Sequence, residues 1–239
     1  MCYNRYKNTR TREGAQMRLC AEKGSIMTRN KKINTVQIVE LAVLMALVAV
    51  LQLTGTAIPL GGTPVSLVLI PIALGAMLLG PYAGALLGLE FGVIVYAAGF
   101  SGADGFTFIL IQDHPIYTAL LCLGKGAAAG FLAGLIYRLL AKKNTVAAVF
   151  AAAATTPIVN TAIFILGGLF MQSTLQSNFL TEGQTVLYFL VVVCAGINFI
   201  FEFGLNLLLA PALARVVDTV NRRFLHVGRA GKKNGEEKQ

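Results

Sequence analysis

Residues 79–92 read LGPYAGALLGLEFG, with a glycine at every fourth position from Gly80 to Gly92 and Glu90 among apolar neighbours. Residues four apart lie on one face of an α-helix, so this stretch predicts a helix with one face of small residues. Glycines repeat at the same spacing over 126–134. Faces of this kind let helices pack closely inside a membrane. We predict that the two stretches form membrane helices that pack tightly within one bundle.

The composition of the chain is that of a membrane protein. Of the 239 residues, 56% are hydrophobic and 13% are charged, about half the charged share of an average soluble domain. Nine of the 20 Lys and Arg residues lie in 1–34, and seven lie in 212–239. The net charge of +9 therefore belongs mainly to the two ends, which is typical of basic flanks on a membrane domain and gives little support to a nucleic-acid role.

Six stretches are apolar over the roughly 20 residues that a helix needs to cross a bilayer. Their predicted boundaries are 35–54, 64–80, 82–100, 115–138, 146–171 and 186–212. Only Gly80 and Pro81 separate the second stretch from the third, but a proline directly after a helix end is a normal stop and restart signal. The predicted fold class is an all-α integral membrane protein, a compact bundle of six transmembrane helices.

The basic residues also predict the orientation, because positively charged flanks stay in the cytoplasm. Both ends of the chain and the loop at 138–143 are basic, and six spans place all three on one side, so both termini are expected to be cytoplasmic. The predicted membrane domain covers 33–217, and 218–239 is a basic cytoplasmic tail. Residues 1–32 are expected to be a disordered basic cytoplasmic tail, or a gene-model extension if translation starts at Met27.

Strongly polar side chains lie in the middle of four of these stretches, and they are Glu90, Lys125, Asn160 and Asn198. Counting about 1.5 Å per residue from the predicted outer ends puts all of them about 15 to 18 Å deep. Glu202 follows Asn198 by four positions and so lies on the same helix face. Polar groups are costly in hydrocarbon, so we expect these side chains to face one enclosed polar cavity.

The predicted substrate-binding residues are these five side chains together with Tyr96, which can offer an aromatic surface nearer the outer mouth. A structural role is an open alternative for the polar residues. Glu90 and Lys125 can form an ion pair between helices, or Glu202 can pair with Lys125 instead. The two asparagines can form interhelical hydrogen bonds.

Catalytic chemistry finds little support in the sequence. The only histidines are His114 and His226, the four cysteines form no CxxC pair, and no HExxH, GxSxG or Walker motif occurs. We therefore expect no metal site and no enzymatic activity. An ion-coupled secondary transporter of a small polar solute is the alternative, although no repeated halves are seen. A subunit with only a packing role would not predict polar residues at one depth.

Several motifs occur in an order that resembles one family of membrane proteins. They are AVLMA at 42–46, the glycine stretch at 79–92, PIVNT at 157–161 and NFIFE at 198–202. Over about 33–217, the chain resembles the substrate-binding S components of energy-coupling factor (ECF) vitamin transporters, nearest the pantothenate-related branch.

The resemblance implies the substrate-capture subunit of an ABC importer, a multi-pass protein of a prokaryotic plasma membrane. An S component of that family binds a small water-soluble vitamin or related micronutrient from outside. It then associates with a transmembrane coupling protein and two ABC ATPases, so the chain itself needs no cofactor and its partners use the ATP. The docking face of the family, alanine-x-x-x-alanine, corresponds here to Ala42 and Ala46. Lys125 would suit an anionic substrate.

Overall fold

The computed structural model describes residues 35–55, 59–60, 63–64, 67–180 and 183–236. The chain divides into two compact units, Met1–Ile38 and Val39–Gln239. Of the first unit the structure describes only residues 35–38, which open a helix, so the tail predicted over 1–32 lies outside the described residues. The packing and the site described below belong to the second unit.

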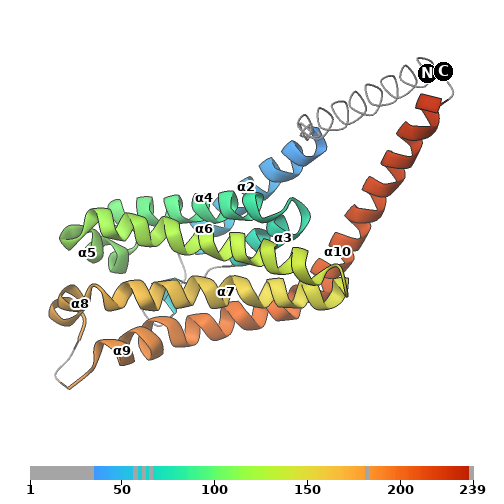
Figure 1. Ribbon diagram of the computed structural model, residues 1–239. Coiled ribbons are helices and arrows are strands. Elements are labelled where there is room, and N and C mark those ends of the chain that lie inside the picture. The colour runs from blue at the N-terminus through green and yellow to red at the C-terminus, as the bar shows by residue number, and fades with distance from the viewer. Residues whose placement is uncertain (1–34, 56–58, 61–62, 65–66, 181–182, 237–239) are drawn as a thin grey trace, which may run out of the picture. The chain divides into compact units, whose positions relative to one another are not determined.

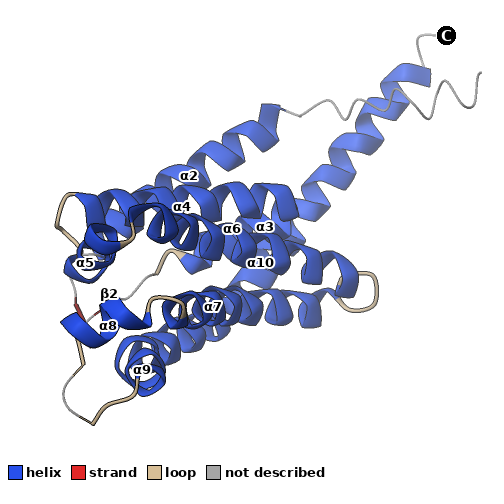
Figure 2. Ribbon diagram, turned by 60° about the vertical axis from the view of Figure 1, so that its left-hand side comes forward, coloured by secondary structure: helices blue, strands red, loops and turns tan. Residues whose placement is uncertain are grey.

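Helices make up nearly all of the described chain (Figures 1 and 2). In order they are α2 Thr35–Gly55, α3 Leu69–Leu78, α4 Pro81–Phe100, α5 Gly105–Asp113, α6 Pro115–Leu140, α7 Thr145–Leu169, α8 Gln172–Asn178, α9 Val186–Tyr188, the π-helix η1 Phe189–Gly196 and α10 Ile197–Glu236. Two antiparallel strands of two residues each, β1 Pro59–Leu60 and β2 Thr63–Pro64, lie between α2 and α3 in the sequence. The predicted all-α class is confirmed.

Among the described residues, five helical stretches are long and apolar enough to cross a membrane. They are α2, α4, α6, α7 and the continuous run Val186–Val220 through α9, η1 and α10. The chain is therefore a multi-pass membrane protein, and five of the predicted spans correspond to helices long and apolar enough to cross a bilayer.

The sixth predicted span, 64–80, is wrong in length. Helix α3 has only 10 residues, which cover about 15 Å at about 1.5 Å per residue, against a hydrocarbon core of about 30 Å. The start of the predicted span is occupied by a strand pair, because Pro64 lies opposite Pro59 across the β1–β2 ladder. The bundle thus has one short helix in place of a sixth full-length span.

Some segments outside the predicted spans are also helical. The short helices α5 and α8 lie between predicted spans. Helix α10 continues to Glu236 and so runs through most of the tail predicted over 218–239.

Helices α4 and α6 pack backbone against backbone. A Cβ atom added to Gly88 would overlap the carbonyl oxygen of Gly126, and one added to Gly126 would overlap that of Gly88. Gly84 and Gly130 are related in the same way one turn further along. Lipid chains give little hydrophobic drive for helix association, so this close approach stabilises the pair through many dispersion contacts. The predicted tight packing of the two glycine stretches is confirmed.

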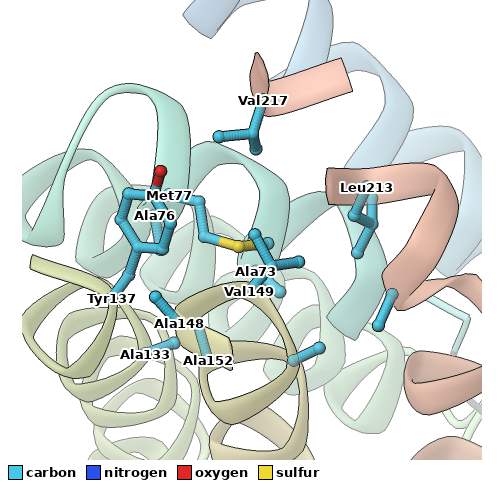
Figure 3. Close-up of a cluster of buried hydrophobic side chains, with 12 residues drawn as sticks. Ala73, Ala76, Met77, Ala133, Tyr137, Ala148, Val149, Ala152, Leu213 and Val217 are labelled. Atoms are coloured by element: carbon cyan, nitrogen blue, oxygen red, sulfur yellow. The ribbon is translucent and has the colours of Figure 1, made fainter. Parts of the chain in front are cut away.

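Helix α6 contacts both α4 and α7, and α7 in turn contacts α10 (Figure 1). The short helix α3 packs with α6, α7 and α10 into a cluster rich in alanine (Figure 3). Ala76 of α3, Tyr137 of α6, Ala152 of α7 and Leu213 of α10 are all buried there. A second apolar cluster joins α5, α8, α9 and η1. The buried polar side chains of α7 and α10 lie between these two clusters in sequence, so the candidate site is bounded by apolar packing at both ends.

Helix α5 begins at a capping aspartate. The carboxylate of Asp104 accepts hydrogen bonds from the backbone N–H groups of Phe106 at 3.2 Å and Thr107 at 3.4 Å, and also from the Thr107 hydroxyl. A cap of this kind satisfies N–H groups that have no partner within the first turn of a helix. Asp104 thereby fixes where α5 starts and where Phe106 lies.

We expect Gly88→Ala to destabilise the protein, because the added methyl group would push α4 and α6 apart. Overpacking of this kind typically costs about 1–3 kcal/mol. The measurement is the thermal transition temperature in detergent, read by size-exclusion chromatography of heated samples. Gly124→Ala is the matched control, since a Cβ atom at Gly124 meets nothing within 4 Å and alanine favours a helix. Equal transition temperatures for the two variants would contradict the packing role of Gly88.

Replacing Asp104 by alanine is expected to destabilise the start of α5 by about 1 kcal/mol, because the cap is lost. Asp104→Asn should keep the helix start, since asparagine caps as well as aspartate does. Amide hydrogen exchange over Gly105–Asp113 should become faster in Asp104→Ala and stay unchanged in Asp104→Asn. Faster exchange in both variants would show that the charge of Asp104, rather than its cap, holds α5.

Candidate functional site

The bundle contains a cavity of about 80 Å³ to which α2, α4, α5, α6, α7, η1 and α10 all contribute side chains. Its lining residues are Gln52, Phe91, Val95, Asp104, Phe106, Thr107, Lys125, Asn160, Thr161, Phe164, Cys194, Ala195, Asn198, Phe199 and Glu202. Hydrogen-bonding groups and aromatic rings thus face the same space. Such a lining can orient a small molecule through a few polar contacts and bury its apolar part against the rings.

Four of the side chains predicted from the sequence meet at this cavity, namely Lys125, Asn160, Asn198 and Glu202. The other two lie outside its lining. Glu90 is partly buried, and its Oε2 atom is buried with no hydrogen-bond partner among the described residues. Tyr96 packs against the apolar cluster between α2, α3 and α4. A substrate-binding role for any of the six stays a prediction, and the structure gives the first four a shared space in which to perform it.

Two polar residues of α10, Asn198 and Glu202, reach the cavity because of their spacing. Asn198, Glu202 and Asn206 are four residues apart and so lie on one helix face. Glu202 is 3% exposed and Asn206 is 1% exposed, and the Asn206 amide donates to the Glu202 backbone carbonyl at 2.8 Å. This face therefore looks into the protein rather than into lipid, as polar groups at membrane depth must.

Lys125 is held against two aromatic rings. Its Nζ atom lies 5.3 Å from the centre of the Phe164 ring and 5.7 Å from that of the Phe91 ring. Both distances are within the range of cation–π attraction. In the described part of the chain, no ion pair joins Lys125 to Glu90, so the structural pair considered from the sequence is not formed.

The contact between α4 and α6 positions this cationic group. Gly126 is locked against Gly88, and each of these glycines is close in sequence to a cavity residue, Lys125 on α6 and Phe91 on α4. A Cβ atom at Gly126 would lie 3.1 Å from the Phe91 ring. Because the two backbones touch, neither Lys125 nor Phe91 can shift far relative to the other. The backbone positions from which Lys125 and Phe91 reach the cavity are therefore fixed relative to each other.

Asn160 supplies a polar group that the protein leaves unsatisfied. Its side chain is only 8% exposed, and its Oδ1 atom has no hydrogen-bond partner among the described residues. Burying such an atom without a partner costs about 1–3 kcal/mol. Since Asn160 lines the cavity, a molecule bound there can supply the missing hydrogen bond.

Phe106, which the sequence offers with Tyr96 as an aromatic contact near the outer mouth, lines the cavity, whereas other lining residues were missed. Phe91 and Phe164 sit among many other apolar residues, and a search for polar outliers does not find them. The position of Gln52 could have been predicted from the sequence, because it follows Leu44 and Val48 at steps of four and so shares their helix face. In the structure all three are buried, with Gln52 3% exposed.

The described residues offer no group of three or more His, Cys, Asp or Glu side chains that could hold a metal ion. Cys122 and Cys194 are buried and lie in separate helices, α6 and η1. The expectation that the chain carries no metal or cofactor stays a prediction.

Comparison with known proteins identifies the family. The family described as ECF transporter, substrate-specific component, matches residues 36–214, well over half of the chain. The matched region contains every residue that lines the cavity, from Gln52 of α2 to Glu202 of α10. A search of curated proteins finds no match. The chain belongs to the family of substrate-specific components of ECF transporters.

Proposed function

We propose that this protein captures a small water-soluble vitamin or a related micronutrient from outside a prokaryotic plasma membrane and delivers it through an ECF-type ABC importer. Its family consists of transport subunits rather than enzymes. The observation that carries the proposal is the cavity, whose walls combine polar side chains with aromatic rings inside a membrane bundle. A membership of the pantothenate-related branch remains a prediction from the sequence.

Ligand capture must widen the cavity. Its volume of about 80 Å³ is well below the about 300–1,000 Å³ of typical small-molecule pockets. Helices α4 and α6 cannot separate without losing their backbone contact. We therefore assign the movement to the walls formed by α7, η1 and α10, which pack through side chains that can change rotamer.

The proposed partners are a transmembrane coupling protein and two ABC ATPases, which would use the ATP while this chain needs no cofactor. Helix α2 supports a docking role for Ala42 and Ala46. Leu44 and Val48 bury one side of the helix, whereas Ala42 and Ala46 lie on its exposed side, with Val43 62% exposed between them. Small side chains on an apolar face allow a partner helix to approach closely.

Transport should depend on the partners, whereas binding should not. We expect the purified protein to bind a vitamin without ATP, and cells to take up that vitamin only when the coupling protein and both ATPases are present. Isothermal titration and uptake of the labelled vitamin measure the two steps. Uptake by this chain alone, driven by an ion gradient, would favour a secondary transporter instead.

Ala46→Trp is expected to abolish transport and co-purification with the coupling protein, because the indole would hold a partner helix away from α2. Binding by the isolated protein should survive, since Ala46 does not line the cavity. Ala162→Trp is the matched control, as Ala162 is exposed on α7. Unimpaired transport by Ala46→Trp would refute the docking face.

A further inference from the structure

We propose that the ligand of the cavity is a compact organic anion, whose charged group lies at Lys125 and whose neutral hydrogen-bonding group reaches Asn160. This inference rests on the proposed function and adds the chemical class of the captured molecule. It is drawn from two polar groups of the cavity, the ammonium of Lys125 and the side-chain amide of Asn160.

The first group is the ammonium of Lys125. Among the described residues that line the cavity, Lys125 is the only cation. Its Nζ atom has three N–H donors, and the structure shows it over the Phe91 and Phe164 rings, with no hydrogen bond or ion pair to any described residue. Ring faces attract a cation but accept no conventional hydrogen bond. A carboxylate of a bound ligand would supply both the opposite charge and the acceptors.

One acidic residue of the cavity, Asp104, has partners of its own. Its carboxylate is occupied by the cap of α5, where it accepts from two backbone N–H groups and from the Thr107 hydroxyl. Glu202 also lines the cavity and is 3% exposed. The Lys125 ammonium, which lies over the two aromatic rings, is therefore the group of the lining that suits an external anion.

The second group is the Asn160 amide, which is more than nine-tenths buried and whose Oδ1 atom is unpartnered among the described residues. An amide can offer either its oxygen or its NH₂ group, so it recognises a hydroxyl, an amide or a ring nitrogen of a ligand. It carries no charge and is poorly suited to neutralise a carboxylate. A ligand that satisfies both residues therefore carries two different chemical groups, an anionic one for Lys125 and a neutral hydrogen-bonding one for Asn160.

The residues around the two groups limit the body of that molecule. Phe164, which contacts Lys125, follows Asn160 by four residues on the same face of α7. One such step rises about 6 Å along a helix, so Asn160 and the ring that contacts Lys125 start from points about that far apart along α7. Phe91, Phe106 and Phe164 line the same space. A short apolar or flat body fits this arrangement.

Pairs of compounds that differ only in their charged group test the proposal. The probes are nicotinate with nicotinamide and pantothenate with panthenol, and thiamine represents a cation. Binding to the purified full chain in nanodiscs is measured by isothermal titration. We expect at least one carboxylate to bind, and its neutral counterpart to bind at least about tenfold more weakly, as loss of a charge-assisted contact predicts.

Variants of Lys125 identify the responsible group. Lys125→Met should remove the preference for the acid over its neutral counterpart, whereas Lys125→Arg should retain it. Lys143→Met is the matched control, because Lys143 is an exposed cation in the turn after α6. Size-exclusion chromatography confirms that each variant is folded, and Lys125→Arg keeps the test decisive if Lys125→Met does not fold. Asn160→Ala should weaken binding of the acid several-fold without changing the preference for the acid.

Three results would overturn the ligand class. They are binding of the neutral compound as tight as that of the acid, an acid preference that persists in Lys125→Met, and no carboxylate bound at millimolar concentration. The proposed function fails separately. A carboxylate bound through Lys125 but transported without the coupling protein would refute the transport role and leave the ligand class intact. Partner-dependent uptake of thiamine, with no carboxylate taken up, would refute the ligand class and leave the transport role intact.

Discussion

The rest of the structure depends on the direct contact between the backbones of α4 and α6. Where a side chain would stand between two helices elsewhere, Gly84, Gly88, Gly126 and Gly130 bring carbonyl groups against the neighbouring helix. Membrane helices gain little from hydrophobic burial, so the pair relies on the number of atoms in close contact. That contact fixes how each of the two helices is rotated about its own axis. The wall that carries Phe91 and Lys125 is a result of this constraint.

Much of the fold could be predicted because the bilayer itself imposes simple rules. Length and apolarity identify α2, α4, α6, α7 and the last long helix, since a spanning helix must satisfy its own backbone hydrogen bonds. The region around α3 follows no such rule. Residues 64–80 are apolar enough for a span, but Pro59 and Pro64 face each other across a short strand pair before α3 begins. That pairing depends on contacts between separate residues, which mean hydropathy does not record.

The depth of the candidate site residues in the membrane could be predicted from the sequence, but the direction in which their side chains face could not. Polar residues in apolar stretches led to Lys125, Asn160, Asn198 and Glu202, which do meet at the cavity. Glu90 has the same depth and yet lies outside the lining. Counting residues gives the height of a side chain along its helix, whereas its facing depends on how the helix is rotated against its neighbours. For α4 that rotation is set by the glycine contacts, and the same rotation brings Phe91 to the cavity.

The glycine contact also divides the cavity into regions that can evolve at different rates. At Gly88 or Gly126, any side chain would meet a backbone carbonyl, so few substitutions on that seam can be accepted. Helices α7 and α10 meet their neighbours through alanine, leucine and valine side chains, whose volumes can be exchanged between adjacent positions. A change of ligand would therefore come from lining side chains such as Lys125 or from the α7 and α10 walls, while the glycine seam between α4 and α6 is kept almost unchanged.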